Sequence, residues 1–390
     1  MKPVPVRVLF CGRPAYGHLY PLMPLAGAAR EAGHDVVFAT GEDFVPRLQT
    51  LGFETHRAGP SMDEAAAEVL RDDPAEPTAD GRPNWEIGGR VVFDVLARRT
   101  ADDLLPLLDR IDPQLVVFEE SDIGAVVAAS LAGIPTICHT LGRAVPPAVV
   151  EQVTGTRAAE LWAHYGKTLV PPEALRGQAR LDICPPSLQE PSAFEQAGRL
   201  PMRPVPWSEP TAVPPTLDDN RSRPLVYLTL ATMQRSIEVL RAAIAGLSTL
   251  DVDVLVALGP LDGSQLGEVP PEVRVERFVD QAGLLPNVDL VVHHGGSATM
   301  LGALSAGLPQ LLLPSGADQF FDGDVIEAAR LGLVLEPLAV SRDAIAEAAT
   351  ALLTDCSYRD AVASVRREIG AMPHPKEVLP DVVRLAEITL

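Results

Sequence analysis

The segment from 293 to 299, HHGGSAT, places two histidines, two glycines and two hydroxyl side chains next to one another. The run LVVH leads into it like a buried strand, and the run TMLGALSAG continues from it like a helix. A helix N terminus offers unpaired N–H groups and a partial positive charge. Gly295 and Gly296 allow close backbone approach, and His293, Ser297 and Thr299 add donors. The pattern predicts a phosphate or diphosphate site.

Two other interpretations of this segment fit less well. The first is a helix capped after a tight turn, with histidines that bind nothing. The second is a metal site. Adjacent residues at a strand end point to opposite faces, so His293 and His294 would not reach one ion. No Cys, Asp or Glu stands close by at ligand spacing.

The surrounding sequence alternates strand-like and helix-like runs in two halves of similar design. VRVLFCG, PLMPLAGAAREAGH and DVVFAT begin the first half, and PLVYLTL, SIEVLRAAIAGLSTL and DVDVLVAL begin the second. Strand, helix and strand in this order form the βαβ unit of a parallel sheet. The predicted fold class is therefore α/β, with two doubly wound domains. Their ligands would lie beyond the C-terminal ends of the strands, where 293–299 falls.

Three segments interrupt this alternation. Residues 203–224 are rich in proline and polar residues and predict a linker. Residues 59–84 and 171–198 show no clear period, and we expect them to be irregular walls above the strand ends.

Composition excludes several classes of function. Asp and Glu number 52 against 32 Lys and Arg, and the formal net charge of −20 disfavours nucleic acid and anionic membranes as partners. No apolar run is long enough for a membrane span, and the first residues lack the pattern of a signal peptide. The four cysteines are scattered without metal-like spacing, which favours a reduced, cytoplasmic setting.

Four motifs together resemble the GT-B-fold, family 1 glycosyltransferases. They are GHLYPLMPLA near the start, DICPPSLQEP in the middle, and RPLVYLTL and HHGGSAT in the second half. Within that family the resemblance is closest to actinobacterial enzymes that attach TDP-deoxysugars to natural products, the calicheamicin glycosyltransferases among them. It implies two Rossmann-like domains facing each other across a cleft. We expect an acceptor domain at 1–202, the linker at 203–224, a nucleotide-sugar domain at 225–376, and a C-terminal helix at 377–390 that packs back on the first domain.

The resemblance also implies a catalytic base in the first domain. The family motif Gly-His-x-x-Pro is GHLYP here, which assigns the base to His18. An imidazole is free to accept a proton at neutral pH, as the attacking hydroxyl requires. The family orients this histidine with a carboxylate after the fourth strand. The matching position is Glu119, and Glu120 or Asp122 could substitute.

The resemblance also assigns residues of this sequence to the site that binds the nucleotide-sugar. The diphosphate site corresponds to His293, Gly296, Ser297, Ala298 and Thr299, although the family commonly has glycine at 298. The pair that binds the sugar hydroxyls corresponds to Asp318 and Gln319. Phe278 takes the place of a base-stacking tryptophan, with Val279 adding backbone contacts, and Thr232 follows the first strand of the domain after Ala231, where glycine is usual.

The implied reaction is an inverting transfer from a TDP-sugar to a hydroxyl of a hydrophobic aglycone in antibiotic biosynthesis, with enediyne acceptors included. No metal or other cofactor is expected, because the diphosphate cradle already supplies donors. The only Asp-x-Asp spacings are at 251–253 and 322–324. The sequence leaves a homodimer as a possible oligomeric state. Two alternatives are kept: a non-catalytic binding subunit of this fold, and a UDP-sugar epimerase or lipid glycosyltransferase.

Overall fold

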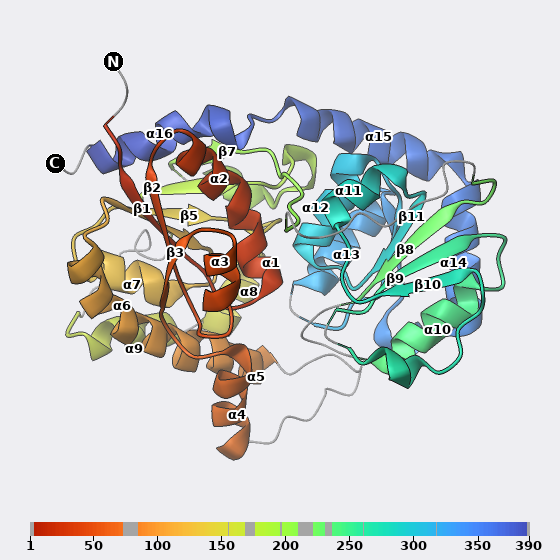
Figure 1. Cartoon of the computed structure of the whole chain (residues 1–390), viewed down its shortest axis with the longest axis horizontal. Helices are drawn as coiled ribbons and strands as arrows, with labels where there is room; N and C mark the ends of the chain where they lie inside the picture. The colour runs from red at the N-terminus through yellow and green to blue at the C-terminus, as the bar shows by residue number, and fades with distance from the viewer. Residues whose placement is uncertain are drawn as a thin grey trace.

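Two parallel α/β sheets lie side by side along the long axis of the molecule (Figure 1). The computed structural model describes residues 4–72, 85–154, 156–167, 176–195, 197–209, 221–230, 236–259, 261–316 and 318–387. All paired strands within each sheet run parallel, as the repeated βαβ pattern predicts.

The first half is a seven-stranded sheet in the order β3-β2-β1-β4-β5-β6-β7. Its strands are β1 (Arg7–Cys11), β2 (Asp35–Thr40), β3 (Glu54–Arg57), β4 (Leu115–Glu119), β5 (Thr136–His139), β6 (Ala179–Asp182) and β7 (Arg199–Pro201). Its helices are α1 (Tyr16–Leu19), α2 (Met23–Glu31), α3 (Val45–Thr50), α4 (Met62–Asp72), α5 (Trp85–Gly89), α6 (Ala97–Ile111), α7 (Ile123–Leu131), α8 (Pro147–Thr154) and α9 (Arg157–His164).

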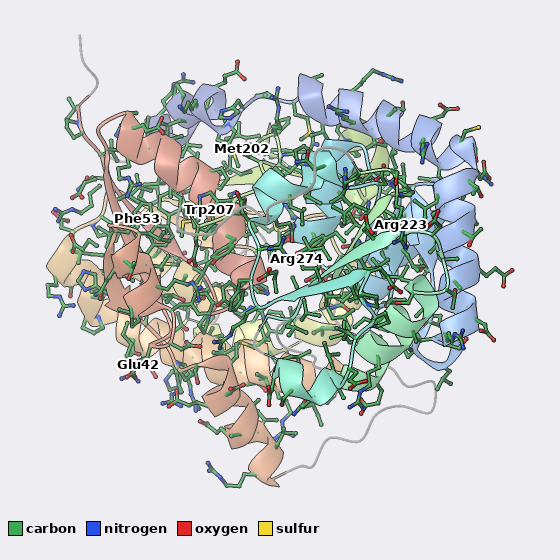
Figure 2. The ribbon with its side chains drawn as sticks, turned by 45° about the vertical axis from the view of Figure 1, so that its right-hand side comes forward. Glu42, Phe53, Met202, Trp207, Arg223 and Arg274 are labelled. Carbon is green, nitrogen blue, oxygen red and sulfur yellow. The ribbon has the colours of Figure 1, made fainter. Side chains whose placement is uncertain are left out.

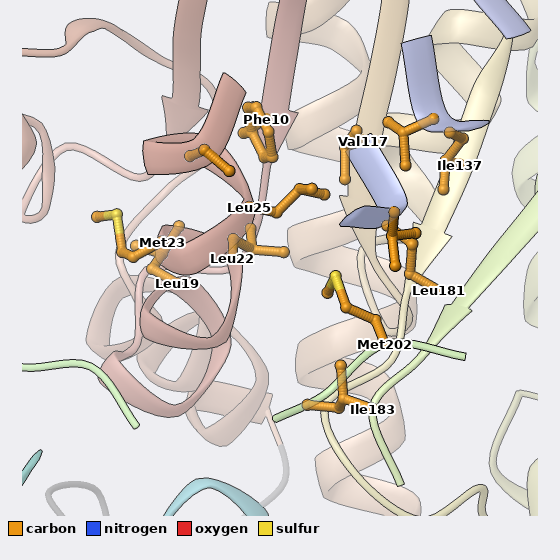
Figure 3. Close-up of a cluster of buried hydrophobic side chains, with 14 of the residues drawn as sticks. Phe10, Leu19, Leu22, Met23, Leu25, Val117, Ile137, Leu181, Ile183 and Met202 are labelled. Carbon is orange, nitrogen blue, oxygen red and sulfur yellow. The ribbon is translucent and has the colours of Figure 1, made fainter. Parts of the chain in front are cut away.

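Alternation along β1 divides the first half into two cores. Val8 and Phe10 face one side, and Leu9 and Cys11 face the other. The first core is shared with α2 and the C-terminal helix, and Figure 3 shows part of it: Phe10, Leu19, Leu22, Met23, Leu25, Val117, Ile137, Leu181, Ile183 and Met202. The second core is closed by α6 and α7. Both faces of the sheet are thus covered, which is why its central strands are continuous apolar runs.

The second half is a six-stranded sheet in the order β10-β9-β8-β11-β12-β13. Its strands are β8 (Leu225–Thr229), β9 (Asp253–Ala257), β10 (Val273–Glu276), β11 (Leu290–His293), β12 (Gln310–Leu312) and β13 (Gly332–Val334). Its helices are α10 (Ile237–Leu247), α11 (Gln281–Leu284), α12 (Ser297–Ala306), α13 (Gln319–Ala328), α14 (Arg342–Thr354) and α15 (Cys356–Ala371).

The last helix, α16 (Pro375–Glu387), returns to the first half. It follows α15 along one edge of the molecule in Figure 1 and packs on α2, where Val378, Leu379 and Val382 join the first core. Lys376 forms an ion pair of 2.6 Å with Glu31. The helix begins two residues before the start expected from the sequence.

The segments expected to be irregular are partly helical. Residues 59–84 contain α4 up to Asp72, and residues 73–84 lie outside the described part of the chain. Apolar residues at helical spacing mark α4, and its Ala65 and Val69 are buried against η2, a π-helical stretch at Arg90–Leu96.

Strand order reverses at one point in each sheet, and both points face the gap between the halves. In the first sheet the reversal lies between β1 and β4, and in the second between β8 and β11. Open parallel sheets bind ligands beyond the C-terminal strand ends at such points. His18 follows β1, Glu119 is the last residue of β4, and the 293–299 segment begins at the last residue of β11.

Candidate active site

A cavity of about 1420 Å³ opens between the two halves. Its walls come from the loops after β1, β4 and β5 on one side and from β8, the loop after β10 and the start of α12 on the other. Trp207 of the connecting segment, labelled in Figure 2, also lines it and packs edge-on against Tyr20 with ring centroids 4.6 Å apart. Ligands held here would contact both sheets.

The structure brings His18 and Glu119 together on the first wall. His18 lies in the short helix α1 and lines the cavity, while Glu119 ends β4 and is fully buried. Nδ1 of His18 is 3.2 Å from Oε1 of Glu119. The Ser121 backbone N–H and hydroxyl also donate to Glu119, at 2.6–2.8 Å. The carboxylate therefore holds the imidazole with Nδ1–H toward itself.

Glu119 is ionised in this setting. Burial alone would raise the pKa of Glu119, but His18, Arg13 and the Ser121 hydroxyl outweigh burial and hold that pKa well below its usual value. A buried carboxylate of this kind fixes the tautomer of its histidine and stabilises the imidazolium that forms on proton uptake.

The two alternative partners of His18 have other contacts. Glu120 forms an ion pair of 2.8 Å with Arg180 and accepts from the backbone N–H of Leu141 at 2.9 Å. Asp122 caps α7 by accepting from the Ala125 N–H at 3.1 Å. Burial raises the pKa of each of these two carboxyls to about 7. Of the three candidates, only Glu119 is placed against His18.

Arg13 is a site residue that the sequence interpretation missed. Its guanidinium Nη2 lies 2.8 Å from Nε2 of His18, and its Nε lies 3.4 Å from Oε1 of Glu119. Arg13 precedes the Gly-His-x-x-Pro motif by four residues, in the loop after β1. That position at a switch point is the signal that could have drawn attention to it.

The second wall carries the N terminus of α12. Gly296 is the N-cap and provides no side chain, so no side chain caps the helix. The residues of its first turn, Ser297, Ala298 and Thr299, line the cavity. Gly295 has φ of 90°, and a Cβ on Gly296 would lie 2.3 Å from Nε2 of His294. The open helix end is suited to an anion.

His293 does not contact the cavity, which corrects the expectation from the sequence. Its ring is fully buried and its Nδ1 accepts from the Gly295 N–H at 3.0 Å. Its Nε2 lies 2.8 Å from Oε1 of Gln310 on the neighbouring strand. Burial, together with His294, lowers the pKa of His293 to about 3. Both ring nitrogens are thus used to fix the turn that leads into α12.

His294 takes the position expected of its neighbour. It lines the cavity, and its buried Nδ1 has no hydrogen-bond partner among the residues that the structure describes. Burial lowers the pKa of His294 to about 4, so the ring is neutral at pH 7. A backbone hydrogen bond with Thr229 opposes this lowering, so a ligand oxygen would compete with Thr229 for the single N–H of the neutral ring.

Ser297 faces carboxylates as well as the cavity. Its Oγ lies 3.1 Å from Oδ2 of Asp318 and 3.0 Å from Oδ2 of Asp322. A hydroxyl has one proton, so one of these two carboxyls must itself be protonated and donate. Burial and Asp318 raise the pKa of Asp322 well above its usual value, which identifies Asp322 as the protonated partner. Ser297 thereby holds Asp318 in place on the cavity wall.

The other residues predicted to bind the nucleotide-sugar are partly on the cavity wall and partly outside the described residues. Gln319 lines the cavity, while its carbonyl oxygen accepts from the backbone N–H groups of Ser315 and Gly316 at 2.8 and 3.1 Å. Phe278 is 46% exposed and lines the cavity with Val279, 6.0 Å from the ring of Tyr16. Ala231 and Thr232 lie outside the described residues.

The first half reaches toward Phe278 through Arg47 of α3. The Arg47 guanidinium lies over the rings of Tyr16 and Phe278, at 4.8 and 5.9 Å from their centroids. It also forms an ion pair with Glu209 of the connecting segment, and the Tyr20 hydroxyl donates to the same carboxylate at 2.5 Å. These contacts join the first half, the connection and the predicted base platform.

We searched the described residues for side chains that could hold a metal ion and for helices that could cross a membrane. Within those ranges, no group of three or more His, Cys, Asp or Glu side chains is arranged to hold a metal ion. The acidic pair at 251–253 is paired with Arg223, at 2.8 Å for Asp251 and 3.4 Å for Asp253. None of the described helices has the length and apolar character needed to cross a bilayer.

Two Rossmann-like halves with a shared cleft, a histidine–carboxylate pair on one wall and an anion-binding helix end on the other define the GT-B class of glycosyltransferases. Comparison with known proteins gives the particular family. Residues 27–231 match the family model "Erythromycin biosynthesis protein CIII-like, N-terminal domain", and residues 241–385 match the corresponding C-terminal domain. The chain belongs to this EryCIII-like family of glycosyltransferases.

Individual relatives agree with this assignment. The chain is 34% identical over 340 residues to L-demethylnoviosyl transferase of Streptomyces niveus, which covers 85% of both chains. It is similar to the crystal structure of the glycosyltransferase SsfS6 of Streptomyces sp. SF2575 with thymidine diphosphate (TM-score 0.80, 28% identity, 97% and 99% covered). It is also similar to the spinosyn rhamnosyltransferase SpnG with spinosyn aglycone (TM-score 0.79, 25% identity, 96% and 99% covered).

Proposed function

We propose that this glycosyltransferase moves a deoxysugar from a TDP-sugar to a hydroxyl of a hydrophobic natural-product aglycone, in antibiotic biosynthesis. The observation that carries the proposal is the cavity itself, with His18 and Glu119 on one wall and the open N terminus of α12 on the other. Relatives whose names specify deoxysugar transfer, and related structures with thymidine diphosphate, support the donor class.

On the acceptor side, His18 acts as the general base. Its Nδ1–H stays on Glu119, so Nε2 takes the proton as the acceptor oxygen attacks the anomeric carbon. Glu119 stabilises the resulting imidazolium, in the way that a buried carboxylate does in a hydrolase triad. A direct attack opposite the leaving group inverts the anomeric configuration.

On the donor side, the leaving diphosphate rests at the start of α12. The backbone N–H groups of Ser297, Ala298 and Thr299, the Gly296 turn and the His294 ring contribute neutral donors and the helix-end partial charge. Thr232 remains a predicted contact of the same site. We propose that these groups hold the diphosphate without a metal ion.

The nucleobase and the sugar of the TDP-sugar would lie on either side of the diphosphate in the same cavity. The nucleobase stacks on Phe278 with backbone contacts from Val279, and Asp318 with Gln319 binds the sugar hydroxyls. Asp318 is prepared for this role because Ser297 and the protonated Asp322 hold it in place.

The acceptor occupies the first-half side of the cavity. Its walls there are largely apolar and include Val92, Phe93, Val145, Val149 and Val150. Such a lining suits a hydrophobic aglycone, with the reacting hydroxyl turned toward His18. An acceptor of calicheamicin or other enediyne type, a cytoplasmic location and a homodimer remain predictions. We also propose 1–202 and 225–376 as the two domains, joined by 203–224, with 377–390 returning to the first.

His18→Ala tests the proposed function. Transfer should fall by about 10²–10⁴, the usual contribution of a general base, while TDP affinity stays within about twofold because the base touches the acceptor and not the nucleotide. Transfer is measured by product formation from a panel of TDP-deoxysugars and aglycones, and affinity by calorimetry. A variant that kept more than half of the wild-type kcat would remove His18 from this role.

A further inference from the structure

The ring of Phe278 belongs to the second half of the molecule but is contacted from the first half. It lies in the loop after β10, and its centroid is 6.0 Å from that of Tyr16 in α1. The Arg47 guanidinium of α3 lies 5.9 Å from the same centroid, within the range of a cation–π contact. Phe278 nonetheless stays 46% exposed, so these contacts hold the ring and leave area on it for a nucleobase.

Arg47 is itself held on several sides. Its Nη1 donates to the Tyr16 hydroxyl, its Nε forms the ion pair with Glu209, and its Cζ lies 4.8 Å from the centroid of the Tyr16 ring. Tyr16 in turn packs edge-on against Phe44, with ring centroids 5.0 Å apart. A planar guanidinium that is bonded in this forked way loses little further freedom when it also contacts Phe278.

The connecting segment ties the same place to the second half. Ser208 accepts a hydrogen bond from the backbone N–H of Ala282 in α11 at 3.0 Å, and the next residue, Glu209, binds Arg47. The support of Phe278 by Arg47 therefore sits beside a segment that is anchored on both halves. The contact between Arg47 and Phe278 exists only while the two halves lie this close together.

We propose that Arg47 is a positioning residue for the nucleobase, which holds the Phe278 ring from the opposite half in the orientation on which the base stacks. This inference rests on the proposed function, in which Phe278 is the base platform. A side chain in a loop gives up rotational freedom when a base stacks on it, and Arg47 removes that freedom beforehand. By linkage, a bound base must stabilise the close arrangement of the two halves by the same factor. Recognition of the base and closure of the halves thus depend on each other.

Arg47→Met tests the positioning, because methionine keeps an unbranched stem without the charge or the donors. TDP affinity should fall about threefold to tenfold, the size expected for one side chain that has to be immobilised on binding. Inorganic pyrophosphate, which has no base, should bind the variant and the wild type equally. Calorimetry gives the Kd for TDP, and competition with TDP gives that for pyrophosphate. Arg99→Met in α6 is the matched control, since Arg99 is 39% exposed against 33% for Arg47 and also forms an ion pair, with Glu68.

A double-mutant cycle assigns the loss to Phe278. Phe278→Leu should weaken TDP binding, and Arg47→Met should cost nothing further in that background. Additive losses would mean that Arg47 contributes without Phe278, which would overturn the proposal. Glu209→Gln removes the charge that holds Arg47 and keeps the shape of the side chain, so it should reproduce part of the loss with the same dependence on Phe278. It decides the question if thermal melting shows that Arg47→Met is not folded.

Hydrogen–deuterium exchange measures the coupling between the halves. TDP should slow exchange of the α3 amides in the wild type, although Phe278 and α12 belong to the second half, and pyrophosphate should not. Arg47→Met should abolish this protection. Arg277→Met should keep it, since Arg277 lies at the same 5.9 Å from the Phe278 centroid but comes from the second half. Protection that survives Arg47→Met would overturn coupling through this residue.

The outcomes separate the two proposals. If TDP binds the wild type no tighter than pyrophosphate and Phe278→Leu changes nothing, the base platform of the proposed function fails and this inference fails with it. If Phe278→Leu weakens TDP binding by about tenfold, the usual contribution of stacking between a base and an aromatic ring, while Arg47→Met and Glu209→Gln keep the wild-type Kd, the platform stands and Arg47 has no part in it.

Discussion

At the scale of single residues, the two adjacent histidines of HHGG do different work. His293 is a buried structural group with both nitrogens engaged, and His294 faces the cavity. Burial lowers the pKa values of both well below 6.5, so neither is charged at neutral pH. At the proposed diphosphate site, attraction would therefore come from neutral N–H donors and the α12 terminus, with no imidazolium involved.

The two histidines should separate cleanly on substitution. His294→Ala removes one neutral hydrogen bond to the diphosphate and should weaken TDP binding by roughly 3- to 10-fold, equivalent to about 0.7–1.4 kcal/mol. Calorimetry with TDP at pH 6 and 8 checks this, and the loss should be the same at both. His293→Ala is the paired variant and should mainly lower the melting temperature. A larger affinity loss in His293→Ala than in His294→Ala would reverse the assignment.

Asp122 makes stability depend on pH in a defined direction. Burial and Glu119 raise its pKa from 3.8 to about 7, so the folded protein holds a proton that the unfolded chain loses near pH 4. The contribution of this carboxyl to stability is therefore full below about pH 4 and is lost as the pH rises through about 7. Asn can still cap α7, because its oxygen accepts as Asp does.

Asp122→Asn should thus melt at a higher temperature than wild type, and the gain should be larger at pH 8 than at pH 5, where only part of the penalty has accumulated. Each kcal/mol regained corresponds to roughly 1 °C in a chain of 390 residues, given an unfolding entropy of about 2.1 cal/mol/K per residue. Thermal melts at the two pH values, monitored by circular dichroism, give the difference. A gain of equal size at pH 5 and pH 8 would mean that protonation of Asp122 is not its cause.

At the scale of elements, the loop after β5 and the start of α12 approach closely across the cavity. Gly142 of that loop lies so near Ser297 that an added Cβ would be 2.6 Å from the Ser297 Cβ. Real Cβ atoms do not come that close, so only glycine permits this approach of the two halves. The contact lies at the first residue of α12, beside the proposed diphosphate site, where water must be excluded during transfer.

Gly142→Ala should hold the halves apart at this contact. We expect kcat/KM for the donor to fall by about tenfold, or about 1.4 kcal/mol, while the melting temperature changes little because neither sheet core is touched. Gly27→Ala in α2 is the control, since nothing lies within 4 Å of its added Cβ. Steady-state kinetics and melting curves of both variants decide it; unaltered kinetics for Gly142→Ala would show that the loop yields freely.

Elements were the most predictable part of this protein, and ring orientations the least. The runs VRVLFCG and LVVHHGG predict the strands β1 and β11, because parallel strands that are buried on both faces are continuous apolar runs. The pairing of Glu119 with His18 followed from a motif and a strand end. The choice between His293 and His294 depended on the residue at which β11 stops. The position of Arg13 depended on a loop conformation that no periodicity encodes.

At the scale of the whole molecule, the negative net charge of the protein disfavours binding of the negatively charged TDP-sugar. The net charge of −20 repels a TDP-sugar at long range, and the local donors must overcome this. Raising NaCl from about 20 to about 200 mM shortens the screening length from roughly 20 to roughly 7 Å. TDP affinity should therefore stay the same or increase on adding salt. A site that relied on long-range attraction would instead lose affinity.

Calorimetric titrations at both salt concentrations measure this effect. EDTA in the buffer removes any contribution from divalent ions, so the same experiment reports whether TDP binds without them. A loss of affinity greater than tenfold on adding salt would contradict local, short-range binding.

The return of α16 to the first half has a practical consequence for following domain motion. Because β1 and α16 belong to the same half, fluorophores fused near either end of the chain ride together and would not sense closure. Cys356, at the start of α15, is exposed, whereas Cys11, Cys138 and Cys184 are buried. A maleimide dye would label Cys356 selectively and travel with the second half. Paired with a fluorophore at one terminus, it turns the native chain into a resonance-energy-transfer reporter of opening and closing.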